Sequence, residues 1–223
     1  MTFVLTWIFS GWLSMDHGRL FSTGKLSAVE TAVIADTPTW ESLPKQGTQS
    51  ISADAREVEW FAFNRKFYRR DRTGLDAQHL VSLDAGTSPR REFLDPGEIS
   101  AFVERVASGC DVPVIVGADD NYAILARMPN APVYRSVCGS VWFHIDGASG
   151  TILERLDPSR RAYRWFYSAL HTMDFPVLSA RPALRSALIV TLCGFGFVFS
   201  LTGAVIGWRR LRLQFLAHTA NTG

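Results

Sequence analysis

The sequence lacks the motifs of the common enzyme classes. It contains no H-E-x-x-H zinc motif, no G-x-S-x-G nucleophile turn and no phosphate-binding loop with its lysine. The glycine-containing segment 147–150 has the composition of a hairpin turn, and the lysine and following helix that a phosphate cradle needs are missing. These absences argue against a hydrolase and favour a non-catalytic protein.

The chain also has little excess charge of either sign. Its 23 Lys and Arg residues nearly balance its 21 Asp and Glu residues, which gives a formal net charge of +2. A chain so close to neutrality has no long-range field for nucleic acid, so no nucleic-acid partner is expected. Two arginine clusters, at residues 69–72 and 160–164, are interpreted as solvated patches or as patches that face lipid headgroups.

Cysteine is scarce, with three residues in the chain, and no C-x-x-C spacing occurs. This argues against a redox motif or a zinc site. Cys193 lies in an apolar segment, where a small side chain is expected. Cys110 and Cys138 can pair if their region faces an oxidising compartment. The two alternatives are therefore a Cys110–Cys138 disulfide and two unlinked structural thiols.

An uncharged segment runs from Ser186 to Trp208 and ends at Arg209, Arg210 and Arg212. As a helix, these residues would extend roughly 34 Å, and the hydrocarbon core of a bilayer is about 30 Å thick. We interpret residues 186–208 as a transmembrane helix, with a buried core helix as the alternative. The arginines that follow predict a cytoplasmic tail at 209–223, although Arg181 and Arg185 at the other end oppose this bias.

Residues 1–15 form a second uncharged and largely apolar run. It would extend only about 22 Å as a helix. A signal peptide is the alternative, but no basic segment precedes the run and no A-x-A-like cleavage site follows it. We therefore expect a transmembrane helix whose first turn is missing, with both termini of the chain in the cytoplasm.

Residues 16–157 have the pattern of a water-exposed α+β domain. A strand is expected over Glu57–Tyr68, with a hairpin partner at Leu80–Leu83. The segment Asp95-Pro96-Gly97-Glu98 has the layout of a capping box and predicts a helix that Gly109 ends. Short strands joined by hairpins are expected at 113–117, 121–128, 132–138, 141–145 and 151–156. This order indicates an α+β fold on an antiparallel sheet.

The segment 158–176 is predicted to be an amphipathic helix that lies on a membrane surface. Asp157-Pro158 would begin it, and aromatic residues recur on one face at helical spacing. Trp165 and Tyr167 suit a membrane interface, where an aromatic ring is half hydrated.

Several segments resemble PepSY-associated transmembrane proteins, in the order that this family shows. They are residues 14–22 (SMDHGRLFS), 146–153 (DGASGTIL), 161–165 (RAYRW), 169–175 (ALHTMDF) and 201–210 (LTGAVIGWRR). The resemblance implies a bacterial cytoplasmic-membrane protein with a PepSY-like domain on the outer side. Members of the family are often associated with iron or siderophore uptake, and some similar, larger proteins bind b-type haem and reduce ferric siderophores.

Two histidines are candidate haem ligands. His17 follows the first predicted span and His171 precedes the second, so both imidazoles would lie near the outer membrane surface if the two helices are neighbours. Neutral imidazole is the usual axial ligand of b-type haem. The alternative is that each histidine forms local hydrogen bonds, or that His171 packs against Tyr167.

Small residues follow one face of the second predicted span, at Gly196, Ser200, Gly203 and Gly207. Small residues at this spacing allow two helix backbones to approach closely within lipid. The expected partner is either the first span, through Ser10, Gly11 and Ser14, or a second copy of the chain.

Three classes of function stay open from the sequence. The first is a membrane-anchored binding or regulatory module that acts on another membrane or periplasmic protein. The second is a haem-dependent electron-transfer protein similar to a ferric reductase, and the third is a peptidase-inhibitor-like module.

Overall fold

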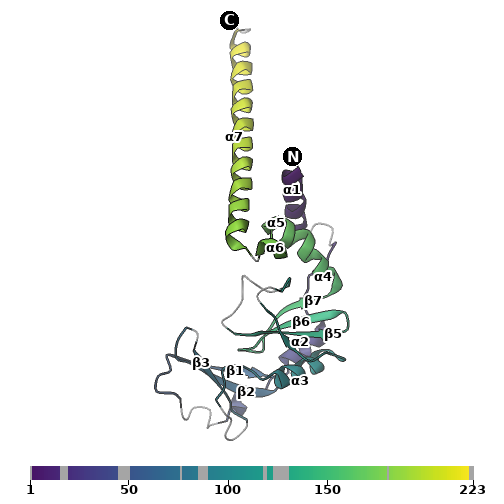
Figure 1. Ribbon diagram of the computed structural model, residues 1–223, viewed down its shortest axis with the longest axis vertical. Coiled ribbons are helices and arrows are strands. Elements are labelled where there is room, and N and C mark those ends of the chain that lie inside the picture. The colour runs from purple at the N-terminus through teal and green to yellow at the C-terminus, as the bar shows by residue number, and fades with distance from the viewer. Residues whose placement is uncertain are drawn as a thin grey trace. The chain divides into compact units, whose positions relative to one another are not determined.

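A computed structural model of the chain describes residues 2–15, 20–44, 51–75, 77–84, 90–117, 120–122, 131–179 and 181–220. The chain divides into two compact units. One unit is Arg19–Tyr163, and the other combines Met1–Gly18 with Arg164–Gly223. Figure 1 shows strands in the first unit and helices alone in the second.

The first unit has the expected α+β composition and contains two antiparallel sheets (Figure 1). The three-stranded sheet has the order β1-β2-β3, from Glu57–Phe63, Lys66–Arg72 and Gln78–Ser82. The four-stranded sheet has the order β4-β5-β6-β7, from Val114–Ile115, Val133–Cys138, Val141–Asp146 and Ile152–Leu156. The helical segments of this unit are α2 (Ala28–Ala35), η1 (Trp40–Ser42), α3 (Pro96–Val106) and α4 (Pro158–Tyr163).

The expected single strand over Glu57–Tyr68 is wrong. Asn64 and Arg65 have φ angles of 48° and 61°, and they form a two-residue turn between β1 and β2. Two successive positive φ angles are what a hairpin of this length requires, because they match the twist of the paired strands. The hairpin partner expected at Leu80–Leu83 agrees better with the structure, since β3 (Gln78–Ser82) pairs antiparallel with β2.

Helix α2 was not expected from the sequence. Its N-terminus is a capping box in which Ser27 and Glu30 exchange hydrogen bonds between side chain and backbone. Glu30 also accepts hydrogen bonds from Arg155 Nε on β7, at 3.0 and 3.1 Å. Most of the strand expected at 121–128 lies outside the described residues.

One hydrophobic core connects the two sheets. Helix α3 buries one apolar stripe, Ile99, Phe102, Val103 and Val106. These side chains join a cluster that contains Phe63, Tyr68 and Leu80 of the three-stranded sheet and Tyr134, Phe143 and Ile145 of the four-stranded sheet. The two sheets therefore share their interior, and neither can be considered a separate domain.

Glu98 connects the start of α3 to the three-stranded sheet. It accepts hydrogen bonds from the Asp95 N–H at 3.1 Å and from Tyr68 Oη at 2.8 Å, and it forms an ion pair with Arg91 at 2.6 Å. Burial alone would raise the pKa of Glu98, but the hydrogen bonds from Arg91 and Tyr68 outweigh burial and hold the pKa below its usual value of 4.5.

The β6–β7 hairpin meets the end of β1 at Gly150. This glycine has a φ angle of +74°, and a Cβ placed on it would clash with Cδ2 of Phe63. A side chain at position 150 would thus overlap the Phe63 ring, and its backbone conformation would also be strained. The close packing of Phe63 on Gly150 brings the two sheets together at one edge.

The second unit contains α1 (Thr2–Ser14), η4 (Arg164–Ala169), α5 (Leu170–Thr172), α6 (Pro176–Ser179) and α7 (Pro182–Ala220). Within α7, the segment Pro182–Leu213 is long and apolar enough to cross a membrane. Its side chains are mostly exposed, including Phe195, Phe199 and Trp208.

Two of the expected elements need correction. Only one helix among the described residues qualifies as a membrane span, because α1 has 13 residues and extends about 20 Å. The segment expected as a helix over 158–176 is helical without a break from Pro158 to Thr172, as α4, the π-helical η4 and α5. It ends earlier than expected, at Met173, which has a φ angle of 54°. Residues 209–220, in the segment expected as a cytoplasmic tail, belong to α7, and their location in the cytoplasm stays a prediction.

We predict that Gly150→Ala lowers the free energy of unfolding of the α+β domain by about 2–5 kcal/mol, from steric overlap and left-handed strain together. Gly139→Ala is the matched control. Gly139 also has a positive φ angle, 60°, but a Cβ there meets nothing within 4 Å, so only about 1–2 kcal/mol should be lost. Urea unfolding of the full chain in detergent, followed by tryptophan fluorescence, measures both values. Equal losses would contradict the Phe63–Gly150 packing.

We also predict that Glu98 contributes to acid sensitivity. Because its pKa is lower in the folded state, ionised Glu98 adds stability above about pH 4.5, and this stability is lost as the pH falls through the folded-state value. Glu98→Gln should therefore reduce the unfolding temperature more at pH 7 than at pH 3.5. Glu41→Gln, at an exposed position, is the control and should show no such difference.

Candidate functional site

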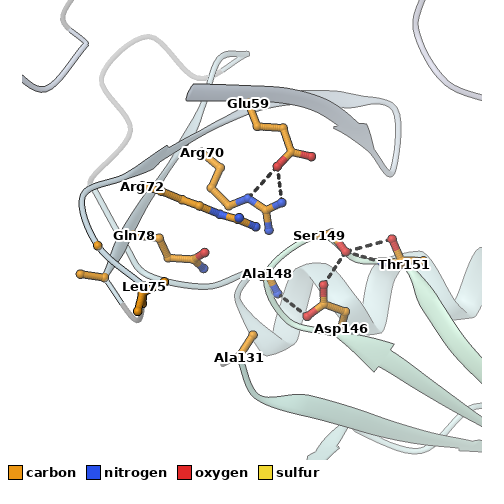
Figure 2. Close-up of a pocket in the computed structure, with 12 residues that line it drawn as sticks. Glu59, Arg70, Arg72, Leu75, Gln78, Ala131, Asp146, Ala148, Ser149 and Thr151 are labelled. Atoms are coloured by element: carbon orange, nitrogen blue, oxygen red, sulfur yellow. Dashed lines mark hydrogen bonds and ion pairs between the residues drawn. The ribbon is translucent and has the colours of Figure 1, made fainter. Parts of the chain in front are cut away.

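A polar cavity of about 420 Å³ lies in the α+β domain (Figure 2). One wall comes from the three-stranded sheet and the loop between β2 and β3, and includes Arg70, Arg72 and Gln78. The other wall comes from the β6–β7 hairpin and includes Asp146 and Ser149. The volume falls in the range of about 300–1,000 Å³ that is typical of small-molecule sites.

The first wall carries two arginines that the strand register places on one face. Arg70 pairs across the sheet with Glu59, and Arg72 pairs with Glu57. Arg70 is 7% exposed, and both its Nε and its Nη2 donate to Glu59 Oε2, the first at 3.1 Å. Arg72 Nη1 donates to Glu57 Oε2 at 3.1 Å, in a pair that is open to solvent.

The second wall is built around Asp146. Asp146 Oδ1 accepts a hydrogen bond from the Ala148 N–H at 3.1 Å, and Oδ2 accepts one from Ser149 Oγ at 2.6 Å. Ser149 Oγ also lies 2.9 Å from Thr151 Oγ1. Asp146 itself is 9% exposed, so the hairpin holds a nearly buried carboxylate at the edge of the cavity (Figure 2).

The sequence interpretation of residues 69–72 as a solvated or headgroup-facing patch is wrong for two of the arginines. Arg69 is 3% exposed and forms an ion pair with the fully buried Asp71 on the same strand. Arg70 is held against Glu59 as described above. The sequence of β2 gave no signal that Arg70 is buried, because Glu59, the carboxylate that pairs with it, lies on β1.

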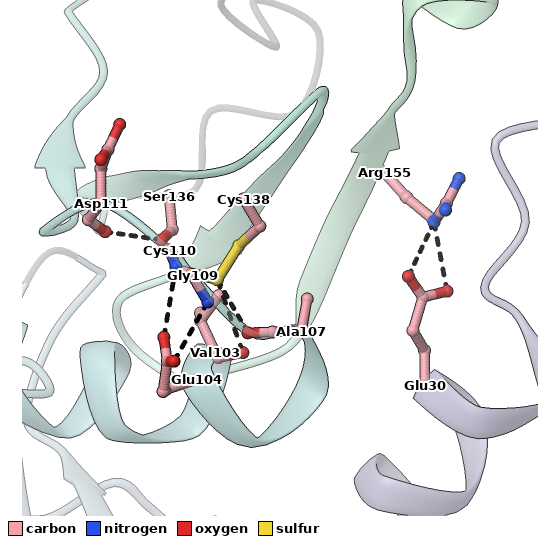
Figure 3. Close-up of a disulfide and its surroundings, with 10 residues drawn as sticks. All are labelled: Glu30, Val103, Glu104, Ala107, Gly109, Cys110, Asp111, Ser136, Cys138 and Arg155. Atoms are coloured by element: carbon pink, nitrogen blue, oxygen red, sulfur yellow. Dashed lines mark hydrogen bonds and ion pairs between the residues drawn. A yellow bond between two sulfur atoms is a disulfide. The ribbon is translucent and has the colours of Figure 1, made fainter.

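Cys110 and Cys138 form a disulfide in the structure (Figure 3). Cys110 follows helix α3, and Cys138 is the last residue of β5, so the bond joins the helix to the four-stranded sheet. Glu104 orders the loop that leads from α3 to Cys110. Its carboxylate accepts hydrogen bonds from the Gly109 N–H at 3.1 Å and from the Cys110 N–H at 3.3 Å.

His171 lies in the helical unit and packs against α1. Its Nδ1 is 3.1 Å from Oγ of the fully buried Ser10, and its ring stacks on Tyr167 at 5.2 Å. Trp7 is a further ring neighbour, at 5.9 Å. These contacts match the local-packing alternative, in which His171 attaches η4 and α5 to α1.

His17, the other candidate haem ligand, lies outside the described residues. Engagement of His171 Nδ1 leaves Nε2 as the nitrogen that could coordinate iron, which is a common arrangement for ligating histidines. Within the described part of the chain, no three His, Cys, Asp or Glu side chains gather as metal ligands. The haem hypothesis therefore stays a prediction.

The small-residue face of α7 is open. A Cβ placed on Gly196, Gly203 or Gly207 meets no described atom within 4 Å, and the same holds for Gly11 of α1. Packing of these α7 glycines against α1 is thus not seen among the described residues. The alternative partner, a second copy of the chain, stays a prediction.

Comparison with known proteins gives no match to a protein-family model, to a curated protein or to a solved structure.

The disulfide leads to a thiol-labelling prediction. Protein produced in the bacterial envelope and denatured without reductant should react with a polyethylene-glycol maleimide once, at Cys193, and three times after reduction. In the Cys193→Ser variant, the two values should be zero and two. Labelling of Cys110 and Cys138 before reduction would contradict the disulfide.

Proposed function

We propose that this chain is a membrane-anchored, PepSY-like binding or regulatory module of the bacterial cytoplasmic membrane. Its α+β domain would face the outside of the cell membrane, and its partner would be another membrane or periplasmic component, in a process linked to iron or siderophore uptake. The proposal rests on the sequence resemblance for the family and for the iron link, and on physical features of the structure for the rest.

Helix α7 supports membrane anchoring. Large apolar side chains such as Phe197 and Phe199 are 69% and 74% exposed along it. A continuous apolar surface of this length is unfavourable in water and is stable in a lipid bilayer. Arg209 and Arg210 follow the apolar segment, which favours a cytoplasmic location for the C-terminal end of the helix.

The disulfide between Cys110 and Cys138 is the single observation that most favours an outward-facing domain. Disulfides persist in oxidising compartments such as the bacterial periplasm and are rare in the cytosol. If the end of α7 is cytoplasmic, a domain on the other side of the membrane meets the conditions that this bond needs.

The polar cavity supports a binding function. Its carboxylates already accept hydrogen bonds, Glu59 from Arg70 and Asp146 from Ser149 Oγ. Convergent polar side chains in a small cavity are what recognition of a ligand needs.

The orientation can be tested with two single cysteines in a Cys193→Ser background. Arg65→Cys places a thiol on the exposed turn of the α+β domain. Arg212→Cys, the matched control, places one beyond the uncharged segment Ser186–Trp208. We expect a membrane-impermeant maleimide to label position 65 in intact spheroplasts and position 212 only after lysis. The reverse pattern would contradict the proposed orientation, and recovery of the protein in the soluble fraction would contradict anchoring.

A further inference from the structure

The cavity of the α+β domain is electrically polarised. Of the ionised side chains that line it, Arg70, Arg72 and Glu59 belong to the sheet wall, and Asp146 belongs to the hairpin wall. Counted over these lining side chains alone, the sheet wall carries one net positive charge and the hairpin wall carries one negative charge. Glu57, the partner of Arg72, does not line the cavity. A ligand that matches this arrangement has an anionic group at one end and a cationic group at the other.

We propose that the cavity binds a small zwitterion of the amino-acid or short-peptide type, with its carboxylate on Arg70 and Arg72 and its ammonium group on Asp146. The inference deepens the proposed binding function by assigning a class of ligand to this cavity.

The two arginines provide the carboxylate site. Figure 2 shows both guanidinium groups directed into the same space, next to Gln78. Arg70 uses Nε and Nη2 for Glu59, so Nη1 is left to donate into the cavity. Glu59 and Glu57 offset part of the repulsion between these two cations, and a carboxylate bound between them would offset more of it.

Arg72 can change partners at little cost. Its ion pair with Glu57 is 40% exposed on the arginine side and 57% exposed on the glutamate side. Exposed pairs of this kind contribute little to stability, because water solvates both ions well. A ligand carboxylate inside the cavity, adjacent to the buried Arg70, offers Arg72 a better-shielded partner than Glu57 does.

Asp146 provides the ammonium site. Its two oxygens accept one hydrogen bond each from the hairpin, from Ala148 and from Ser149. A carboxylate has about four lone-pair positions, so acceptor capacity is left for a ligand N–H. The hairpin bonds orient the carboxylate before the ligand binds, which lowers the entropic cost of binding.

The test is isothermal titration of the full chain in detergent with the dipeptide Ala-Ala. Two blocked dipeptides separate the two ends: acetyl-Ala-Ala lacks the ammonium group, and Ala-Ala-amide lacks the carboxylate. We expect saturable binding of Ala-Ala, with each blocked form at least tenfold weaker. The absence of binding at millimolar Ala-Ala, or equal affinity for the three peptides, would overturn the proposal.

Variants then assign each end. Arg72→Gln should weaken Ala-Ala at least tenfold and leave Ala-Ala-amide unchanged, because that peptide has no carboxylate to lose. Asp146→Asn should weaken Ala-Ala and leave acetyl-Ala-Ala unchanged. Arg65→Gln, which removes an arginine outside the cavity, is the matched control and should bind Ala-Ala as the unchanged chain does.

A purely structural effect of these substitutions would weaken all three peptides together and would overturn the assignment. Arg72→Lys keeps the charge and loses the planar fork, so it should bind Ala-Ala with intermediate affinity. The titration does not depend on membrane orientation. Its failure and the failure of the labelling test for anchoring can therefore be distinguished.

Discussion

The absence of a side chain at Gly150 allows the Phe63 ring to pack on the backbone of the β6–β7 hairpin, and much of the domain depends on this contact. Phe63 ends β1 and belongs to the core that helix α3 covers. Where the hairpin touches β1, the two antiparallel sheets share one interior. The same approach places Asp146 of the hairpin opposite Arg70 of β2, so the packing that stabilises the fold also forms the two walls of the cavity.

Two further features are the basis for the cellular location that we propose for this domain. The Cys110–Cys138 bond links the loop that follows α3 to β5. Glu104 already orders this loop through a hydrogen bond from the Gly109 N–H, so the two cysteines are held close together before the bond forms. Helix α7 presents an apolar surface that water does not solvate well. An oxidising compartment next to a bilayer satisfies both requirements, which is the physical basis for proposing an envelope location.

The sequence predicted those elements whose signals are local. Helix α3 was expected because Asp95 and Glu98 form a capping box within four residues, and the α+β class followed from the order of helix and hairpins. The turn at Asn64–Arg65 was missed because arginine is an uncommon residue at a positive φ angle. That error hid the cavity, since only the β1–β2 register reveals that Arg70 faces Glu59. The haem prediction rested on a family resemblance and on His17, which lies outside the described residues, so the structure leaves it as a prediction.

The contact between Phe63 and Gly150 can be measured directly by nuclear magnetic resonance of the full chain in detergent micelles, with labelled phenylalanine and glycine. Packing of Phe63 on Gly150 predicts a nuclear Overhauser effect between the Phe63 ring protons and a Gly150 Hα. It also predicts a ring-current shift of that Hα, because the Hα points in the direction in which a Cβ would meet the ring. The absence of both signals in the folded protein would contradict this packing, because the two sheets would then lack the contact that forms the cavity.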